Sequence, residues 1–290
     1  MAATTREAMV VRPLTRFGLG AEVTGIDLSL PQGEAVRQAL RAAWTEHAVL
    51  AIRNQKLEPQ AFVAAAQIFG EILEQQVKKF SLPGHPLIGT VSNRDLPAVD
   101  GRQHVRGENF HTDHSNFPAP PKATLLHAVN LPRSGGDTQF VDVRAAFDDL
   151  DPGLRRRIVA LRSPHVYESS QSPRRMAELP PEERARIPQT SQPLVIRHPD
   201  SGRSALYLNT GRMEGIEGMP TEAGFRLIGQ LYAHATQPKY EYRHRWRDGD
   251  LVIWDNRSVM HQANADVDPS DYRYLYRLML KGAPLQAAVA

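Results

Sequence analysis

Short apolar runs with the length of β-strands recur along this chain and constrain its fold more than any other feature. They lie at residues 49–52, 123–130, 139–143, 250–256 and 272–280. Turn-forming residues bound these runs, and mostly short connections between strands are typical of antiparallel sheets. We therefore predict a mainly β protein in which two antiparallel sheets pack together and flanking helices lie outside them.

Helical periodicity appears between the predicted strands. Apolar spacing predicts a helix that ends before Val49 and a second one from Pro59 to Phe69, with proline in its first turn. Residues 144–161 are predicted as one helical segment, and residues 221–236 as a helix with Thr221 at its N-cap.

A single large domain is the simplest organisation for this sequence. With 290 residues, 41% of them hydrophobic, the chain can bury a sizeable core. No internal repeat or clear boundary divides it, so we predict one domain over 1–290. Periodicity breaks down at 163–193, where prolines are frequent. A long irregular connection in a compact domain is usually functional or disordered, and we predict that 163–193 is an insertion that forms an active-site lid.

Composition narrows the function classes. The chain has no cysteine, which excludes thiolate metal sites, cysteine nucleophiles and disulfides together. The N-terminal residues lack an apolar core of signal-peptide length, and no apolar run is long enough to span a bilayer. The formal net charge is +3, and no stretch interleaves aromatic residues with a basic stripe. We expect a cytoplasmic protein that binds neither membranes nor nucleic acids.

The segment ENFHTDHSNF, residues 108–117, carries the strongest candidate site. Side chains alternate along an extended chain, so His111 and Asp113 would share a face while His114 points away. The third ligand of a metal would be His261, just beyond an apolar strand. Two histidines and a carboxylate suit non-haem Fe(II) with open positions. A local hydrogen-bonded pair is the alternative for an isolated His-x-Asp.

Two further motifs favour a site that binds anions. Thr138 follows the GGDT turn at the start of a strand, where its hydroxyl can donate to a buried anion. In YRYLYR, strand alternation places Arg273 and Arg277 on one face. The apolar residues that follow predict that this strand is buried, and buried guanidinium groups need anions to meet them.

Together these motifs resemble a known family. HTDHSNF, PRSGGDTQFVDVRAAFDDL, WDNRSVMHQA and YRYLYR occur in the order seen in the taurine/2,4-dichlorophenoxyacetate dioxygenase family of Fe(II)- and 2-oxoglutarate-dependent oxygenases. The resemblance covers roughly residues 10 to 282 and implies a double-stranded β-helix (jelly-roll) core. It places His111, Asp113 and His261 where the family has its catalytic iron ligands.

The resemblance also implies how the co-substrate is held. Thr138 and Arg273 match the positions that bind the distal carboxylate of 2-oxoglutarate. Arg277 matches a second arginine near the co-substrate or an acidic substrate, and Trp254 matches an aromatic residue beside the co-substrate. The implied reaction consumes O2 and oxidises a small, anionic organic substrate, by hydroxylation or oxidative cleavage, with release of succinate and CO2. Relatives are commonly oligomeric, so we expect a homo-oligomer.

Two other function classes use some of the same residues. A zinc-dependent hydrolase on a β-sandwich would use the same His, Asp and His, but it leaves Thr138 and Arg273 unexplained. A metal-free jelly-roll binding protein would keep only the scaffold. Metal content and 2-oxoglutarate binding separate these hypotheses.

Overall fold

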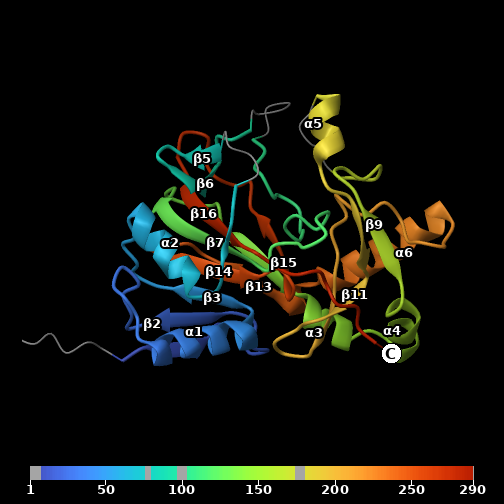
Figure 1. The fold of residues 1–290 in the computed structure, drawn as a ribbon, viewed down its shortest axis with the longest axis horizontal. Helices are drawn as coiled ribbons and strands as arrows, with labels where there is room; N and C mark the ends of the chain where they lie inside the picture. The colour runs from blue at the N-terminus through green and yellow to red at the C-terminus, as the bar shows by residue number, and fades with distance from the viewer. Residues whose placement is uncertain (1–7, 76–79, 97–102, 174–179, 290) are drawn as a thin grey trace, which may run out of the picture.

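The computed structural model describes residues 8–75, 80–96, 103–173 and 180–289. A large mixed sheet forms the centre of the molecule (Figure 1). Its strands are antiparallel except for one parallel pair near an edge. In spatial order they are β1 (Val10–Pro13), β2 (Ala21–Thr24), β3 (Val49–Ile52), β14 (Leu251–Asp255), β7 (Ala123–Asn130), β16 (Tyr274–Leu280), β6 (His85–Ser92) and β5 (Ser81–Leu82), with β4 (Ile72–Leu73) also on β16.

A smaller antiparallel sheet packs against the middle of the large one. It consists of β13 (Glu241–His244), β8 (Thr138–Asp142) and β15 (Val259–Ala263). Phe140 of this sheet lies 5.4 Å from the ring of Trp254 in the large sheet, and both side chains are buried in one apolar cluster. The prediction of two packed antiparallel sheets is therefore confirmed, and the candidate site lies between them.

Two helices cover the outer face of the large sheet, as the apolar spacing predicts (Figure 1). Helix α1 (Glu34–His47) buries Leu40, Ala43 and Trp44 against it, and α2 (Pro59–Gln67) begins with proline at its first position. Because the two faces of β7 pack against different apolar clusters, its first six residues are all buried. This explains why its sequence is apolar without alternation.

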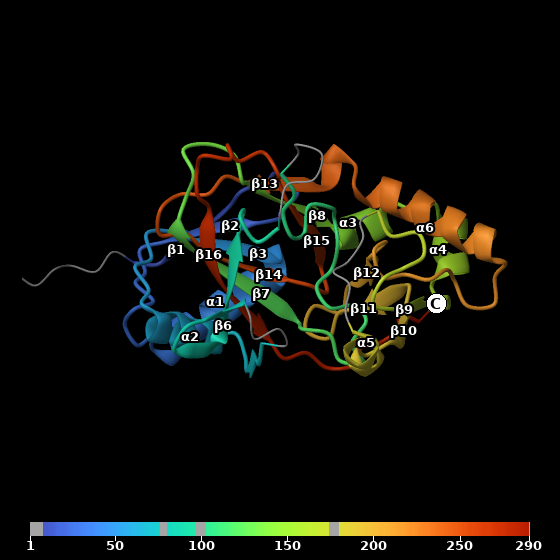
Figure 2. The same cartoon turned by 90° about the horizontal axis from the view of Figure 1, so that it is seen from above.

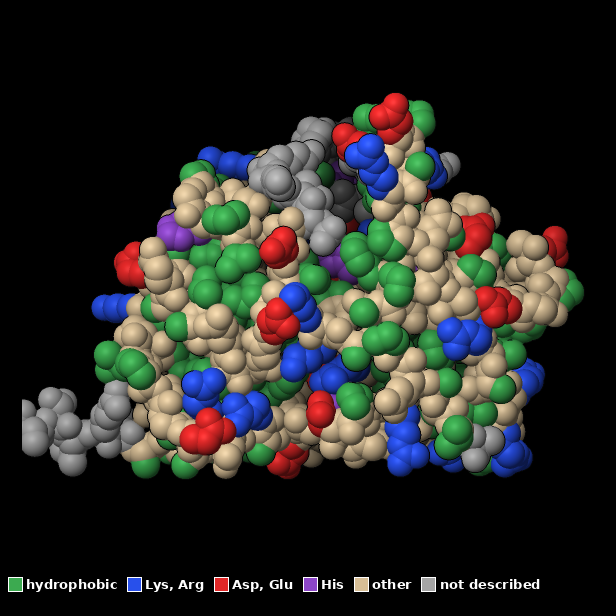
Figure 3. Space-filling view, viewed as in Figure 1, with side chains coloured by type: hydrophobic (Ala, Val, Ile, Leu, Met, Phe, Trp, Pro, Cys, Tyr) green, Lys and Arg blue, Asp and Glu red, His purple; other side chains and the backbone are tan. Residues whose placement is uncertain are grey.

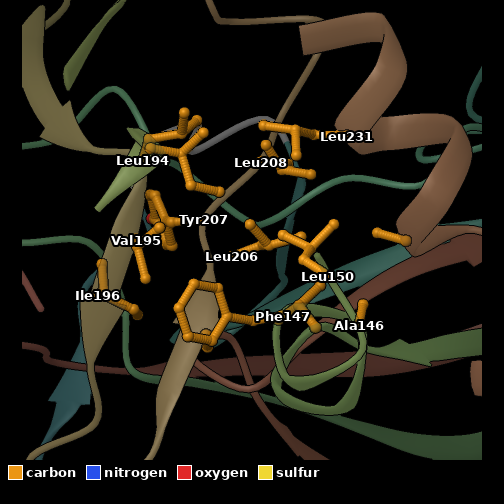
Figure 4. Packing of buried hydrophobic residues seen from close by; sticks show 14 of the residues in the cluster. Ala146, Phe147, Leu150, Leu194, Val195, Ile196, Leu206, Tyr207, Leu208 and Leu231 are labelled. Carbon is orange, nitrogen blue, oxygen red and sulfur yellow. The ribbon is translucent and has the colours of Figure 1, made fainter. Parts of the chain in front are cut away.

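A second apolar core lies beyond the small sheet. Figure 2 shows α6 (Thr221–Ala235) running along this end of the molecule, and Figure 4 shows buried side chains from helices and strands meeting there. The other elements around this core are α3 (Val143–Asp148), α4 (Pro152–Ile158), β11 (Val195–Arg197), β12 (Ser204–Leu206) and the 3-10 helix η2 (Pro238–Tyr240).

Two details of the helix predictions were wrong. The segment 144–161 is not one helix: α3 ends at Asp148, and the Asp151 side chain accepts bonds from the first amides of α4. Asp151 followed by Pro152 is a strong helix start, which breaks the segment in two. In α6, Pro220 takes the N-cap position and Thr221 is the first helical residue.

The segment 163–193 has more regular structure than its sequence predicts. Strand β9 (Arg162–His165) pairs with β10 (Thr190–Pro193), and helix α5 (Pro181–Arg186) lies between them in the chain. Residues 174–179 lie outside the described residues. Its role as a lid stays a prediction.

No helix among the described residues is both long enough and apolar enough to cross a membrane. Basic and acidic side chains occur together on the face seen in Figure 3, with basic ones gathered at the lower right near α4.

Candidate active site

Three side chains with metal-binding atoms meet between the two sheets. The structure brings His111, Asp113 and His261 together, with one donor atom from each within 4.8 Å of the others. The Nε2 atoms of His111 and His261 lie 3.6 and 3.7 Å from the two carboxylate oxygens of Asp113. A set of two imidazoles and one carboxylate fits a divalent iron that keeps positions open.

Backbone pairing fixes the two histidines relative to each other. His111 and His261 form an isolated antiparallel bridge in which each amide donates to the other carbonyl at 3.0 Å. His261 belongs to β15, so this bridge extends the edge of the small sheet. Asp113 lies in a turn instead of the expected strand end. The shared face of His111 and Asp113 therefore comes from the turn, not from strand alternation.

A backbone acceptor sets the tautomer of His111. Its Nδ1 lies 2.8 Å from the carbonyl oxygen of Asn109, which can only accept a proton. Nδ1 therefore carries the hydrogen and Nε2 is left with the free lone pair. Gly107 allows this ring position, because it has φ +78° and an added Cβ would lie 2.9 Å from Cε1 of His111.

Burial and mutual charge set the protonation of the cluster. Burial acts against ionisation of Asp113, but the neighbouring His261 and His111 hold its carboxyl pKa well below the usual value. Burial, followed by the electrostatic effect of the neighbouring His111, lowers the pKa of His261 to about 3. A carboxylate and an imidazole nitrogen with a free lone pair are the forms that bind a metal cation.

His114 is not part of this cluster. It has φ +46°, and its ring packs edge-on against Phe117 with the centroids 5.1 Å apart. Burial lowers its pKa to about 4. The prediction that His114 points away from the metal ligands agrees with this geometry, and the side chain is partly buried.

Thr138 and Arg273 form a buried set of hydrogen-bond donors. Nη2 of Arg273 lies 3.5 Å from Oγ1 of Thr138, and Trp246 donates to the same oxygen at 3.1 Å. The Nε of Arg273 is buried without a partner among the described residues. Burial lowers its pKa to about 10, which still leaves it charged at neutral pH. A buried cation with a donor that no other group uses fits an anionic ligand.

The double-glycine turn makes room for Arg273. Gly136 has φ +72°, and an added Cβ would lie 2.6 Å from Cδ of Arg273. The turn is therefore more than a connection, because the arginine side chain passes where any larger residue would stand.

Arg277 is a second guanidinium in the site, and it is partly buried. Its Nη2 makes one long contact of 3.5 Å to Oε1 of Gln75, and its Nε is buried without a partner. Among the described residues it forms no ion pair, and burial lowers its pKa. Arg106, which also faces the site, is instead paired with Asp95 at 2.8 Å.

A cavity of about 90 Å³ joins these groups. The three candidate metal ligands, both arginines, Thr138 and Trp254 all line it. The Trp254 ring lies 4.6 Å from that of His261, and its Nε1 donates to Asn256. The indole N–H is therefore used outside the cavity, and Trp254 presents only its aromatic ring to the cavity. Two further residues of the site were not predicted from the sequence. Trp246 donates a hydrogen bond to Thr138, and Thr124 donates one to Asp113.

Known proteins are similar to this chain in sequence and in fold. The family model "Taurine catabolism dioxygenase TauD, TfdA family" matches residues 11–279. The 2,4-dichlorophenoxyacetate dioxygenase of Burkholderia sp. (strain RASC) is 35% identical over 227 residues, which cover 75% of this chain and 76% of the relative. An α-ketoglutarate-dependent sulfate ester dioxygenase of Pseudomonas putida is 32% identical, with 91% of this chain and 87% of the relative covered.

A solved structure matches over almost the whole chain. AAD-2, crystallised with Mn(II) and N-oxalylglycine, is 29% identical and superimposes with a TM-score of 0.83, covering 97% of this chain and 100% of AAD-2. The jelly-roll core and the use of Fe(II), 2-oxoglutarate and O2 follow from these matches together with the His-Asp-His cluster. The chain belongs to the TauD/TfdA family of Fe(II)- and 2-oxoglutarate-dependent dioxygenases.

Proposed function

We propose that this dioxygenase oxidises a small anionic organic molecule whose negative charge binds Arg277. The substrate class is an aryloxyalkanoate, a sulfonate, a sulfate ester or an amino-acid derivative, and the reaction releases succinate and CO2. Relatives named for 2,4-dichlorophenoxyacetate and for sulfate esters support an acidic substrate.

The unpaired charge of Arg277 carries this proposal. The charges of Fe(II) and Arg273 are balanced by Asp113 and the doubly ionised 2-oxoglutarate. Arg277 then remains charged and partly buried beside the metal ligands, with its Nε atom buried and without an ion pair among the described residues. A charge that is partly removed from water and has no partner is unfavourable, so a singly charged substrate would complete the balance.

Each site residue has a distinct role in this scheme. His111, Asp113 and His261 would hold the iron, which supplies the oxidation of a substrate C–H bond when it is bound. Thr138 and Arg273 would bind the distal carboxylate of 2-oxoglutarate and so orient its other end toward the metal.

Part of the cavity wall is apolar. Leu126 and Trp254 of the large sheet are buried and line the cavity together with the proposed metal ligands. Next to such a wall the guanidinium charges act more strongly than they would in water. The segment 163–193 is proposed as the lid that closes the site, and a homo-oligomer remains the predicted assembly.

Succinate release from a substrate panel tests the proposal. The panel contains aryloxyalkanoates, alkyl sulfonates, sulfate esters, N-acyl amino acids and a neutral amide or alcohol counterpart of each. We expect turnover of at least one anionic class, dependent on Fe(II), 2-oxoglutarate and O2 together. His111→Ala and His261→Ala should each abolish it. Preference for the neutral counterparts would contradict the proposal.

The Arg277→Gln variant tests the charge partner directly. It should raise KM for the anionic substrate by about 10-fold or more, the effect expected from losing a charged hydrogen bond of roughly 1.5–3 kcal/mol. Arg133→Gln is the matched control, because Arg133 is exposed and pairs with Asp271 away from the site. An unchanged KM in Arg277→Gln would reject this role.

Neither alternative from the sequence fits the site as well. A zinc hydrolase leaves Thr138, Arg273 and their buried donors without a role, and a metal-free binding protein is inconsistent with membership of a dioxygenase family.

A further inference from the structure

A chain of buried hydrogen bonds runs from the WDN segment to the metal-binding carboxylate. Nε1 of Trp254 lies 3.0 Å from Oδ1 of Asn256, and Nδ2 of Asn256 lies 3.1 Å from Oγ1 of Thr124. Oγ1 of Thr124 then lies 2.6 Å from Oδ2 of Asp113. Trp254, Asn256 and Thr124 are each no more than 2% exposed, so water does not compete for these bonds.

The chemistry of the groups sets the direction of every bond in this chain. An indole N–H can only donate, so it must meet the amide oxygen of Asn256. This orients the amide, and its NH2 group then donates to Thr124 and to the carbonyl oxygen of Pro121 at 3.2 Å. The Thr124 oxygen is therefore an acceptor toward Asn256, and its own proton points at Asp113, whose carboxylate can only accept.

This directed chain distinguishes the two oxygens of Asp113. Each oxygen lies near one imidazole, Oδ1 at 3.6 Å from Nε2 of His111 and Oδ2 at 3.7 Å from Nε2 of His261. Only Oδ2 also accepts a short bond from a neutral hydroxyl, whereas Oδ1 makes no bond to a hydroxyl or amide among the described residues. A carboxylate with one oxygen held in this way is fixed in rotation about its Cβ–Cγ bond. Oδ1 is then the oxygen left free to bind a metal.

We propose that Thr124, oriented by Asn256, is a positioning residue that limits Asp113 to one metal bond, through Oδ1. This inference rests on the proposed assignment of His111, Asp113 and His261 as ligands. Its consequence concerns the coordination sites that remain. A carboxylate that binds through one oxygen leaves three positions of an octahedron open, whereas one that binds through both leaves two. 2-Oxoglutarate would need two of these positions, in an orientation set by Thr138 and Arg273, and O2 would need the third. A second bond from Asp113 would therefore compete with the co-substrate for a position that it requires.

The alternative is that Thr124 only satisfies a buried carboxylate. In that case removal of its hydroxyl would lower stability and leave the coordination of the metal unchanged. The two roles therefore differ in what happens to ligand binding at the metal, which can be measured without turnover.

Binding measurements on the full chain separate these roles. In Thr124→Val the hydroxyl is lost and the shape is nearly kept, and we expect the affinity of the Mn(II) protein for 2-oxoglutarate to fall roughly 10- to 100-fold by calorimetry. Mn(II) affinity itself should change much less, because Asp113 can gain a second bond. Thr124→Ser restores the hydroxyl and should restore 2-oxoglutarate affinity.

A matched control lies between His111 and Asp113 in the chain. Thr112 is 2% exposed and its hydroxyl donates to the carbonyl of Leu208 at 3.2 Å instead of to Asp113. Thr112→Val should leave 2-oxoglutarate affinity near that of the unsubstituted protein. An equal loss in Thr112→Val and Thr124→Val would overturn the proposal, because a general disturbance of the loop would then explain both.

A crystal structure of Thr124→Val with Mn(II) and N-oxalylglycine would show directly how many oxygens of Asp113 bind the metal. We expect both oxygens of Asp113 within bonding distance of Mn(II), against one in the unsubstituted protein. Unchanged one-oxygen binding, or unchanged 2-oxoglutarate affinity, would overturn the role of Thr124 while leaving the proposed function standing. Failure of the unsubstituted protein to bind Mn(II) at this site would overturn both. Failure of anionic substrates alone would leave the role of Thr124 intact.

Discussion

The indole N–H of Trp246 donates to the hydroxyl oxygen of Thr138 at 3.1 Å, while Arg273 stands over the face of the same indole with its Cζ 5.6 Å from the ring centroid. Both Trp246 and Arg273 can only donate to Thr138. The proton of the Thr138 hydroxyl is therefore left for a ligand in the cavity.

Loss of this indole N–H should weaken co-substrate binding. Trp246→Phe keeps an aromatic face for Arg273 but removes the donor. We expect the affinity of the Mn(II) protein for 2-oxoglutarate to fall about 5-fold, as for the loss of one hydrogen bond of ~1 kcal/mol. Calorimetry measures this. Trp246→His, if its ring nitrogen donates to Thr138, should recover part of the loss, and an unaltered affinity in Trp246→Phe would contradict the argument.

Substitution of Gly136 should displace Arg273. In Gly136→Ala the new methyl group would lie 2.6 Å from Cδ of Arg273, and φ is +72°. We expect a loss of about 1–3 kcal/mol in the free energy of unfolding from backbone strain, and in addition a loss of 2-oxoglutarate binding. Gly84→Ala is the control, since Gly84 has φ +77° with nothing within 4 Å of the added atom. If both variants bind 2-oxoglutarate equally well, the turn does not position Arg273.

Buried His165 should make the protein less stable in acid. Burial, followed by the charge of Arg212, lowers its pKa in the folded protein to about 3. The unfolded chain has a histidine pKa of about 6.5, so between these values only the unfolded state binds the proton. Stability therefore falls as pH drops below about 6.5, by up to about 1.4 kcal/mol per unit from this residue.

Urea unfolding of His165→Gln between about pH 5 and 7 checks this sign. The variant should show a shallower dependence of stability on pH than the unsubstituted protein. A parallel or steeper dependence would mean that His165 is not the group responsible.

A divalent metal should stabilise the fold as well as enable turnover. His111, Asp113 and His261 converge only in the folded chain, so the ion binds the native state preferentially. Free Mn(II) at 100 times its dissociation constant should raise the free energy of unfolding by about 2.7 kcal/mol. Thermal unfolding with and without chelator measures the effect. His261→Ala should remove it, and a Mn(II) shift that persists in His261→Ala would place the ion elsewhere.

Local patterns predicted much of the fold because local forces determine those elements. The bounds of β7 agree with its apolar run, and the apolar stripe of α1 faces the sheet as its spacing requires. The segment 163–193 was harder to predict. Prolines occupy positions within β9 and β10, and an isolated pair of strands does not need the alternation that marks a strand in a large sheet.

The site was predictable where its residues carry a chemical signature. His111, Asp113 and His261 lie together, and Arg273 and Arg277 line the same cavity. Thr124 and Trp246 lack such a signature. Thr124 looks like any polar residue in a buried strand, and its contact with Asp113 depends on how β7 meets a turn that the sequence alone does not place.

The reciprocal backbone bonds between His111 and His261 have a consequence for protein synthesis. A nascent chain displays the HTD segment long before β15 has left the ribosome. Until then, His111 and Asp113 would offer an ion only two of the three proposed ligands. Iron loading would thereby be postponed until the small sheet has closed, and a product truncated before β15 would lack the third proposed ligand.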